Sequence, residues 1–312
     1  MKYIYKGIGL LVVLATTSCG LIFEKSIKNS DLVVNSPADS STTIKYSQQF
    51  KWEPVNDATR YRLQVCEKNF TSGIFVYDTT VTGTQLVLTF QPGEYAWRLR
   101  AENSGSETDF HNGMLYVKKG NFIEQMVTIV GPNVDYISTK SSIKFSWQKL
   151  YDAKKYILEI DTIIGDFSKP IISDTISNSL TEITKVISNR GDYWWRMKAI
   201  SSTDEQTLYS SPQTFFYSMA DISLLAPKNS DKVSAPISFS WSPIDNTKNY
   251  KLYIYKSDSV TTYSTQTVST NSFSLNQDDI DLGKTYYWSV SAIDNNGFIG
   301  NSSKRIKFTV NP

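Results

Sequence analysis

Residue types that most enzyme chemistry needs are nearly absent from this sequence. Its 312 residues include one histidine, His111, and two cysteines. Serine and cysteine hydrolases need a base beside the nucleophile, and no Gly-x-Ser-x-Gly motif or Gly-rich phosphate-binding loop occurs. One histidine and one spare cysteine cannot supply the three or four protein ligands of a zinc site. We therefore expect no catalytic site, no metal and no cofactor, and we interpret His111 as a solvated loop residue.

An excess of charge of one sign is also missing. The formal net charge is +2, and the two basic residues that account for it, Lys2 and Lys6, lie at the N-terminus. Proteins that bind nucleic acid neutralise phosphates with clusters of lysine and arginine. The even balance of charge elsewhere predicts no nucleic-acid partner.

Long apolar runs are confined to the N-terminus. Residues 8–15 are apolar, follow Lys2 and Lys6, and lead into Thr16-Thr17-Ser18. A run of this length cannot cross a hydrocarbon core of about 30 Å as a helix, whereas it suits the apolar region of a signal peptide. The pattern predicts a cleavable signal peptide over residues 1–18.

Cys19 directly follows these small residues. The arrangement resembles the bacterial lipobox, although Thr16 stands where that pattern usually has leucine. The resemblance implies that Cys19 is diacylated and becomes the mature N-terminus, so that lipid anchors the protein durably to a membrane. Residues 19–30 then form a tether. The alternative is an ordinary secretory signal with a chance cysteine.

Cys66 is the remaining cysteine, so the mature domains must be stable without an intrachain disulfide. Tyr61, Leu63 and Val65 share one face of a predicted strand, which turns Cys66 away from the core. Two interpretations follow: an inert, half-shielded cysteine, or a reactive or dimer-forming thiol.

Tryptophan, in contrast, is plentiful and periodic. Trp52, Trp147 and Trp241 stand 95 and 94 residues apart. Internal repeats of this kind indicate copies of one structural unit. The same register is kept by further aromatic residues and prolines, namely Phe50, Phe145 and Phe239, Tyr61, Tyr156 and Tyr250, Trp97, Trp195 and Trp288, and Pro37, Pro132 and Pro227.

Each copy alternates apolar and polar residues, as in Ile143-Lys144-Phe145-Ser146-Trp147 and Tyr250-Lys251-Leu252-Tyr253-Ile254. This period of two predicts strands, and turn-rich segments such as Pro92-Gly93 separate them. About seven short strands per copy predict an antiparallel sandwich of two sheets. The fold class is therefore all-β.

The copies resemble fibronectin type III domains. Trp241, Tyr250 and the segment from Tyr286 to Ala292 carry the resemblance most fully. It implies three tandem immunoglobulin-like sandwiches after the signal peptide, over residues 31–118, 124–218 and 222–312. The second tryptophan of each copy stands where the family usually has an aliphatic residue, and this variation resembles envelope proteins of Bacteroidota.

Groups of acidic residues offer two further candidate sites. Glu159 and Asp161 alternate on a strand opposite Arg196 and Lys198, which favours charge pairing over glycoside hydrolysis by two carboxylates. Asp278, Asp279 and Asp281 carry oxygens of the kind that bind Ca²⁺, but they also lie where polar turn residues are expected.

Tyrosines mark one candidate binding face. If Tyr250, Leu252 and Ile254 point inward, Tyr253 and Tyr255 point outward, and Tyr287 does so on the neighbouring strand. The same alternation turns Trp194 outward in the second copy, beside Ile157. Three interpretations remain open: ordinary strand aromatics, a platform for sugar rings, or a face for a protein partner.

Together these features predict a non-catalytic lipoprotein of the cell envelope that acts as a binding or structural rod on the outer membrane. The resemblance leaves open whether it occupies the periplasmic or the surface face, and whether its ligand is an envelope protein or a polysaccharide. The alternative function is a surface glycan-binding lipoprotein of a polysaccharide-utilisation system that uses the exposed tyrosines of the third copy.

Overall fold

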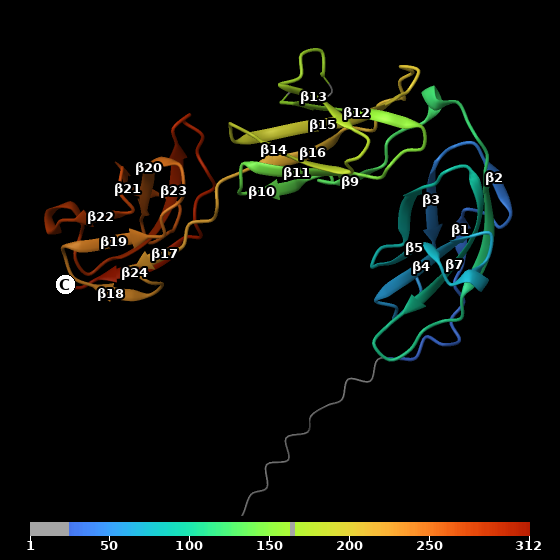
Figure 1. Ribbon diagram of the computed structural model, residues 1–312. Coiled ribbons are helices and arrows are strands. Elements are labelled where there is room, and N and C mark those ends of the chain that lie inside the picture. Colours follow the sequence, from blue (N-terminus) through green and yellow to red (C-terminus); the bar gives the residue numbers. More distant parts are fainter. Residues whose placement is uncertain (1–24, 163–165) are drawn as a thin grey trace, which may run out of the picture. The chain divides into compact units, whose positions relative to one another are not determined.

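The computed structural model describes residues 25–162 and 166–312, so the predicted signal peptide and Cys19 lie outside the described residues. The chain divides into two compact units. The first comprises the described residues up to Thr43 with Gln49–Val87 and Gly93–Val117, and the second comprises Ile44–Gln48, Leu88–Pro92 and Lys118–Pro312. Figure 1 colours the strands along the sequence, from blue near the N-terminus to red at the C-terminus.

The first sandwich combines a sheet of three strands with a sheet of five. The strand orders are β1-β3-β6 and β2-β8-β7-β4-β5, and β2 runs parallel to β8. The elements are β1 (Val34–Ser36), β2 (Ser41–Thr43), β3 (Ser47–Trp52), β4 (Arg60–Glu67), the 3-10 turn η1 (Phe70–Ser72), β5 (Phe75–Val81), β6 (Gln85–Thr89), β7 (Gly93–Glu102) and β8 (His111–Val117).

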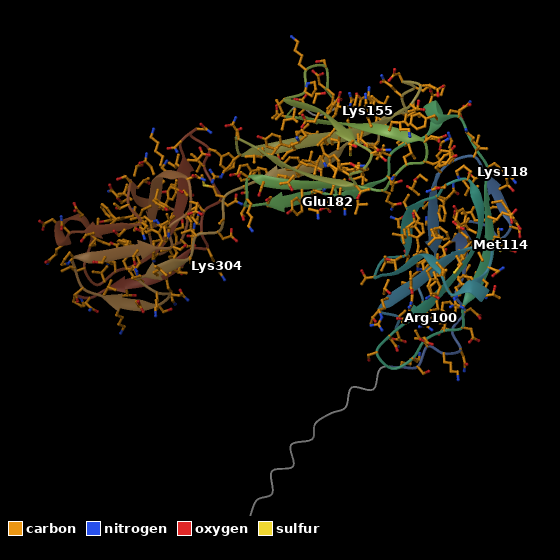
Figure 2. All side chains as sticks on the ribbon, viewed as in Figure 1. Arg100, Met114, Lys118, Lys155, Glu182 and Lys304 are labelled. Atoms are coloured by element: carbon orange, nitrogen blue, oxygen red, sulfur yellow. The ribbon has the colours of Figure 1, made fainter. Side chains whose placement is uncertain are left out.

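The second sandwich repeats this arrangement. Its sheets have the orders β14-β11-β9 and β10-β16-β15-β12-β13, with β10 parallel to β16. Figure 2 shows Lys155 on the larger sheet and Glu182 on the smaller one. The elements are η2 (Phe122–Glu124), β9 (Ile129–Gly131), β10 (Tyr136–Ser138), β11 (Ser142–Trp147), β12 (Ala153–Asp161), β13 (Ile172–Ser177), β14 (Glu182–Val186), β15 (Gly191–Ser201) and β16 (Gln213–Tyr217).

The third sandwich has the same pair of sheets, β17-β19-β22 and β18-β24-β23-β20-β21. Strand order and pairing are thus the same in all three sandwiches, which confirms the predicted all-β fold of tandem immunoglobulin-like, fibronectin type III-like sandwiches. The elements are β17 (Leu224–Ala226), β18 (Asp231–Val233), β19 (Ile237–Trp241), β20 (Thr247–Tyr255), β21 (Thr262–Val268), β22 (Ser272–Leu275), η3 (Gln277–Asp279), β23 (Thr285–Asp294) and β24 (Ile306–Val310).

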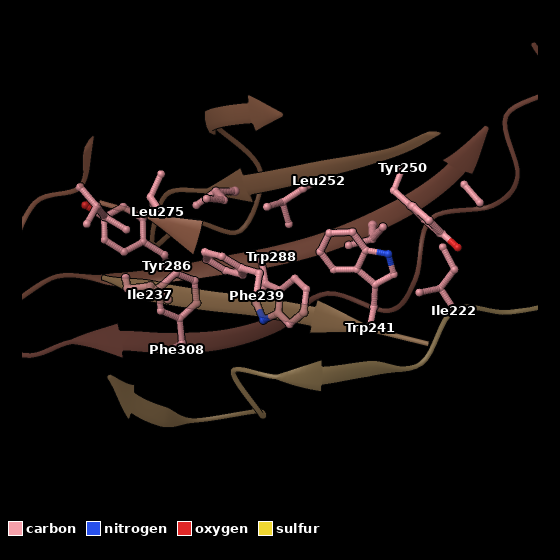
Figure 3. Packing of buried hydrophobic residues seen from close by; sticks show 14 of the residues in the cluster. Ile222, Ile237, Phe239, Trp241, Tyr250, Leu252, Leu275, Tyr286, Trp288 and Phe308 are labelled. Carbon is pink, nitrogen blue, oxygen red and sulfur yellow. The ribbon is translucent and has the colours of Figure 1, made fainter. Parts of the chain in front are cut away.

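The repeated tryptophans form the centre of each core, as Figure 3 shows for the third sandwich. Trp241 and Trp288 lie with their ring centroids 6.5 Å apart, and Phe239 packs edge-on against Trp288 at 5.1 Å. Phe145 and Trp195 make the same edge contact in the second sandwich, at 4.9 Å. The large aromatic rings fill the space between the sheets, which explains why no disulfide is needed there.

The repeated tyrosines also have a backbone partner in every copy. The hydroxyl of Tyr61 accepts a hydrogen bond from the N–H of Val55 at 2.9 Å. Tyr156 and Tyr250 accept the equivalent bonds from Leu150 at 2.9 Å and Ile244 at 2.8 Å. Each tyrosine therefore fixes the connection between the first-tryptophan strand and the next strand, because a buried N–H must find an acceptor.

Some residues outside the three predicted copies are also buried. Ile27, within the predicted tether, is 2% exposed and donates its N–H to Ser106 Oγ at 2.9 Å. Met219, between the second and third copies, joins the third core together with Ile222, the first residue of the third copy. Ile27 therefore packs on the first sandwich, because an isoleucine side chain gains free energy on leaving water.

Candidate functional site

The outer face of the third sandwich carries the tyrosines singled out in the sequence. Tyr253 and Tyr255 alternate with core residues on β20, and Tyr287 lies directly opposite Tyr255 on β23. Tyr253 and Tyr255 stack with their centroids 6.2 Å apart. The outward direction of all three side chains agrees with the predicted alternation.

Tyr255 is nevertheless buried, and the expectation that it is exposed is wrong. It is 6% exposed, because the guanidinium of Arg305 lies 4.1 Å from its ring centroid and is held there by the carbonyl of Ser259. Tyr253 and Tyr287 remain half-buried. A side chain that points away from the core can still be covered by a neighbouring connection, so the three tyrosines do not form one open platform.

The second sandwich covers its outer face with a cluster that we call the Arg196 clamp, formed by Arg196, Phe167, Tyr209 and Glu159. The guanidinium of Arg196 lies 4.2 Å from the Phe167 ring and 3.7 Å from the Tyr209 ring. Glu159 accepts hydrogen bonds from Arg196 Nε and from the Tyr209 hydroxyl, both at 2.8 Å. The first sandwich places Arg98 between Phe70 and Phe110 in the same way, at 4.5 and 4.3 Å.

Glu159 therefore lies in the predicted charge pair with Arg196. Asp161 accepts the N–H of Thr162 at its own Oδ1 and lies opposite Trp194, not opposite Lys198. Trp194 is accordingly not beside Ile157, which pairs with Lys198. Sequence reasoning missed the aromatic partners of the clamp, since Phe167 and Tyr209 lie in connections where no strand alternation applies.

Cys66 points to the outer face of the first sandwich but is fully buried, with 0% of its surface exposed. Its ladder neighbours are Phe75 and Ala96. Burial raises the pKa of the thiol, with a small opposing effect of Arg98. Both the burial and the raised pKa make the thiolate scarce, and the thiolate is the reactive form.

The other residues considered for chemistry are apart from one another. His111 begins β8 instead of lying in a turn, and its ring stacks on Trp97 at 5.8 Å. Asp278 and Asp279 lie in the short turn η3. Over residues 25–162 and 166–312, no group of three or more His, Cys, Asp or Glu side chains is placed to hold a metal ion. None of the helical turns in that same part of the chain is long and apolar enough to cross a membrane.

Trp194 lines a hollow of about 650 Å³ at one end of the second sandwich. Here β12 and β14 end while β13 and β15 begin, so four strand ends surround the hollow. Trp194 is half-buried, whereas Ile171 and Val186 are 53% and 69% exposed. The rim also carries the polar side chains of Asn189 and Asp192, both exposed. We call this feature the Trp194 hollow.

The connection before β15 shapes this hollow. Gly191 has φ of 146°, a conformation that L side chains rarely adopt, and it lets the chain turn between Arg190 and Asp192. The hydroxyl of Tyr193 donates to the carbonyl of Asn189 at 2.6 Å and holds the connection against the strand. The wall beside Trp194 is therefore fixed by the backbone itself.

This arrangement suits a ligand that has both hydroxyl groups and a flat apolar face. An indole offers a broad surface for stacking, and the amide of Asn189 and the carboxylate of Asp192 offer a donor and acceptors. Concave sites with a few placed polar groups are the usual form of a ligand site. The Trp194 hollow meets this description better than the partly covered tyrosines of the third sandwich.

Comparisons with known proteins bear on the fold alone. No family model matches the chain, and no curated protein matches it. Among solved structures, the chain is similar to the FN1–FN3 domains of chicken CNTN1, with 16% sequence identity over 90% of this chain and 97% of that chain. The TM-score of 0.26 is too low for any argument, so the fold assignment rests on the strand order and register given above.

Proposed function

We propose that this protein is a non-catalytic, lipid-anchored protein of the bacterial outer membrane that binds a glycan in the Trp194 hollow. The proposed location at the outer membrane rests on the N-terminal sequence, in which a short apolar run leads through small residues into Cys19. The fibronectin type III-like sandwiches then serve as rigid modules that hold a ligand site. Among bacteria, the Bacteroidota are the group whose envelope proteins the sequence resembles.

The observation that carries the binding proposal is a half-buried tryptophan in the wall of a 650 Å³ hollow. Of the seven tryptophans in the chain, Trp194 is the one that falls outside the repeated core positions. Core packing therefore does not account for it. A sugar ring stacked on the indole would cover its solvent-exposed face, and tryptophan side chains of this kind favour such contacts.

Binding then works without any change in the backbone of the hollow. The ring of a sugar stacks on Trp194 while its hydroxyl groups replace water at Asn189 and Asp192. Because Gly191 and the Tyr193–Asn189 hydrogen bond already fix the wall, little conformational entropy is lost on binding.

Affinity electrophoresis of residues 25–312 tests the proposal. The protein is run through gels that contain starch, xylan, mannan, pectic galactan, chondroitin sulfate or mucin. We expect retardation on at least one polymer, and we expect Trp194→Ala to lose it. The matched control is Tyr253→Ala with Tyr287→Ala, which removes the half-buried tyrosines of the third sandwich and should leave retardation intact.

The controls separate the outcomes. Retardation that survives Trp194→Ala but disappears in the tyrosine variant would move the site to the third sandwich, the alternative that the sequence suggests. If no polymer retards the wild-type protein, the glycan proposal is overturned, and a protein partner in the envelope becomes the remaining class of ligand.

A further inference from the structure

Arg190 lies at the meeting point of three hollows in the second compact unit. Besides the Trp194 hollow, it lines hollows of about 310 and 460 Å³. Ser188 lines the first two, and Ser141 lines the last two. The three hollows are therefore neighbours, and they lead from Trp194 toward residues of the third sandwich such as Asn246.

The side chain of Arg190 is fixed at this point. It is 7% exposed, and its Nη1 donates to Asp294 Oδ2 at 3.0 Å, while Asp294 is 4% exposed. Its Nη2 donates to the carbonyl of Asp245 at 3.3 Å. Asp294 Oδ1 in turn accepts the N–H groups of Asn296 and Phe298, both at 2.9 Å. Arg190 therefore joins the second sandwich to the end of β23 and to the connection before β20 in the third.

One polar atom at this point has no partner. The Nε of Arg190 is buried without a hydrogen-bond partner among the residues that the structure describes. A buried donor left unpaired costs free energy, and a bound water or ion is one explanation for such groups in native proteins. This atom is a second indication, besides the hollows, that the junction receives a polar molecule.

The walls of the two smaller hollows are rich in short polar side chains. Hydroxyl groups come from Ser141, Ser188 and Tyr217, and amides come from Asn246, Asn295 and Asn296. Lys140 and Asp245 add a charge of each sign to the larger of the two. Mixed donors and acceptors without an excess of either charge suit a neutral, hydroxyl-rich ligand better than an anion or an apolar peptide.

We propose that the glycan site extends from Trp194 past Arg190 into the junction between the second and third sandwiches, so that it binds a linear oligosaccharide along several sugar units. The inference rests on the proposed function, and it adds a subsite built by two sandwiches. The Arg190–Asp294 pair positions both walls of this subsite. One end of the sugar chain stacks on the indole of Trp194. The third sandwich binds units further along the chain, so the site selects longer oligosaccharides over shorter ones.

Isothermal titration calorimetry with sugars of two lengths tests the extension. The probes are maltose and maltohexaose, xylobiose and xylohexaose, and mannobiose and mannohexaose. The hexasaccharide of the recognised series should bind at least tenfold more tightly than the disaccharide. Ser141→Trp fills both smaller hollows and should lower hexasaccharide affinity at least tenfold, with disaccharide affinity unchanged.

Two further variants keep the test decisive. Asn295→Trp blocks the junction from the third sandwich and should act like Ser141→Trp, so the result does not depend on one variant's folding. Ser179→Trp places an indole on the exposed turn between β13 and β14, away from the hollows, and should change nothing.

Failure of the extension and failure of the glycan site give different results. If Trp194→Ala abolishes binding but neither junction variant affects the hexasaccharide, the extension is overturned while the glycan site stands. If both sugar lengths bind equally to the wild-type protein, the extension is likewise overturned. If no sugar binds and no polymer retards the protein, both proposals fall.

Discussion

At the scale of single residues, Cys66 shows that a side chain that points away from the core can still be buried. Its neighbours Tyr61, Leu63 and Val65 face the core, so Cys66 faces outward on β4, yet it is completely covered. The thiol lies between Phe75 and Ala96 in the ladder. The alternation of a strand fixes the direction, but what covers the far face depends on connections that a local pattern does not describe.

We predict that Cys66 does not react in the folded protein. Burial excludes reagents and raises the pKa of the thiol, so at pH 8 the thiolate fraction lies below that of an exposed cysteine. Native protein without Cys19 should show no labelling by iodoacetamide within an hour, and protein in guanidinium chloride should be labelled completely. Rapid labelling of the native form would show that the site is open.

Tyr255 shows what the sequence could and could not tell about the candidate site. The strand period correctly predicted that Tyr253, Tyr255 and Tyr287 share one face. The cover over Tyr255 comes from Arg305, which lies 50 residues along the chain and outside any strand. The same alternation predicted that Trp194 points outward, whereas the hollow around it is built by four strand ends that no local pattern brings together.

At the scale of structural elements, each sandwich depends on its central aromatic residues. Trp241 is 0% exposed on β19 and packs on Tyr250 of the opposite sheet at 5.5 Å. We predict that Trp241→Ala lowers the free energy of unfolding of the third sandwich by about 3–5 kcal/mol, the usual cost of such a truncation.

Urea denaturation followed by circular dichroism measures this change in Trp241→Ala. Trp194→Ala is the matched control, because it removes the same side chain from a half-buried position and should cost less than about 1.5 kcal/mol. Equal losses in the two variants would show that Trp241 does not form the core.

The Arg196 clamp ties together strands and connections on the outer face of the second sandwich. Arg196 and Glu159 are 24% and 12% exposed, so solvent screens their interaction only in part. A double-mutant cycle with Arg196→Met and Glu159→Gln should give a coupling energy of about 1–2 kcal/mol.

Lys144 and Glu182 supply the comparison for this cycle. They are diagonal neighbours on paired strands, since Lys144 lies opposite Thr184 and Glu182 lies opposite Ser146. Their ion pair measures 2.6 Å, but the side chains are 60% and 59% exposed. An exposed pair is worth about 0.2–1 kcal/mol, so Lys144→Met and Glu182→Gln should show the smaller coupling. A coupling at the clamp no larger than at this pair would contradict the account.

At the scale of the whole molecule, the repeats predicted the number and kind of sandwiches but not what joins them. Arg190 and Asp294 are 104 residues apart, and nothing in their local sequence marks either as a partner. Met219 packs so closely on Gly300 that a Cβ there would lie 2.8 Å from its Sδ. Such junctions depend on contacts between residues far apart in the sequence. The sequence pattern of a single copy therefore does not predict them.

We predict that Asp294→Asn destabilises the second unit by about 3 kcal/mol at pH 7, because it leaves Arg190 buried without its partner. Burial by itself raises the pKa of Asp294, but hydrogen bonds from Arg190, Phe298 and Asn296 outweigh it and hold the pKa below the ordinary value of 3.8. The stabilisation is therefore present above pH 3.8 and is lost as the pH falls through the lower pKa of the folded state.

Thermal unfolding at pH 7 and at pH 2.5 tests this prediction. The difference between wild type and Asp294→Asn should shrink at the lower pH. Asp245→Asn is the control. Arg190 donates to the backbone carbonyl of Asp245 and not to its side chain, so this substitution keeps the hydrogen bond. An Asp294→Asn variant as stable as Asp245→Asn at pH 7 would show that the pair does not hold the junction.

The central claim is that a glycan covers Trp194. Hydroxyl-radical footprinting of residues 25–312, read by mass spectrometry with and without the retarding polysaccharide, tests it most directly. Oxidation of Trp194 should fall at least fivefold when the glycan is bound, while oxidation of Tyr253 and Tyr287 stays the same. Unchanged oxidation of Trp194 alongside protected tyrosines would contradict the claim and place the ligand on the third sandwich.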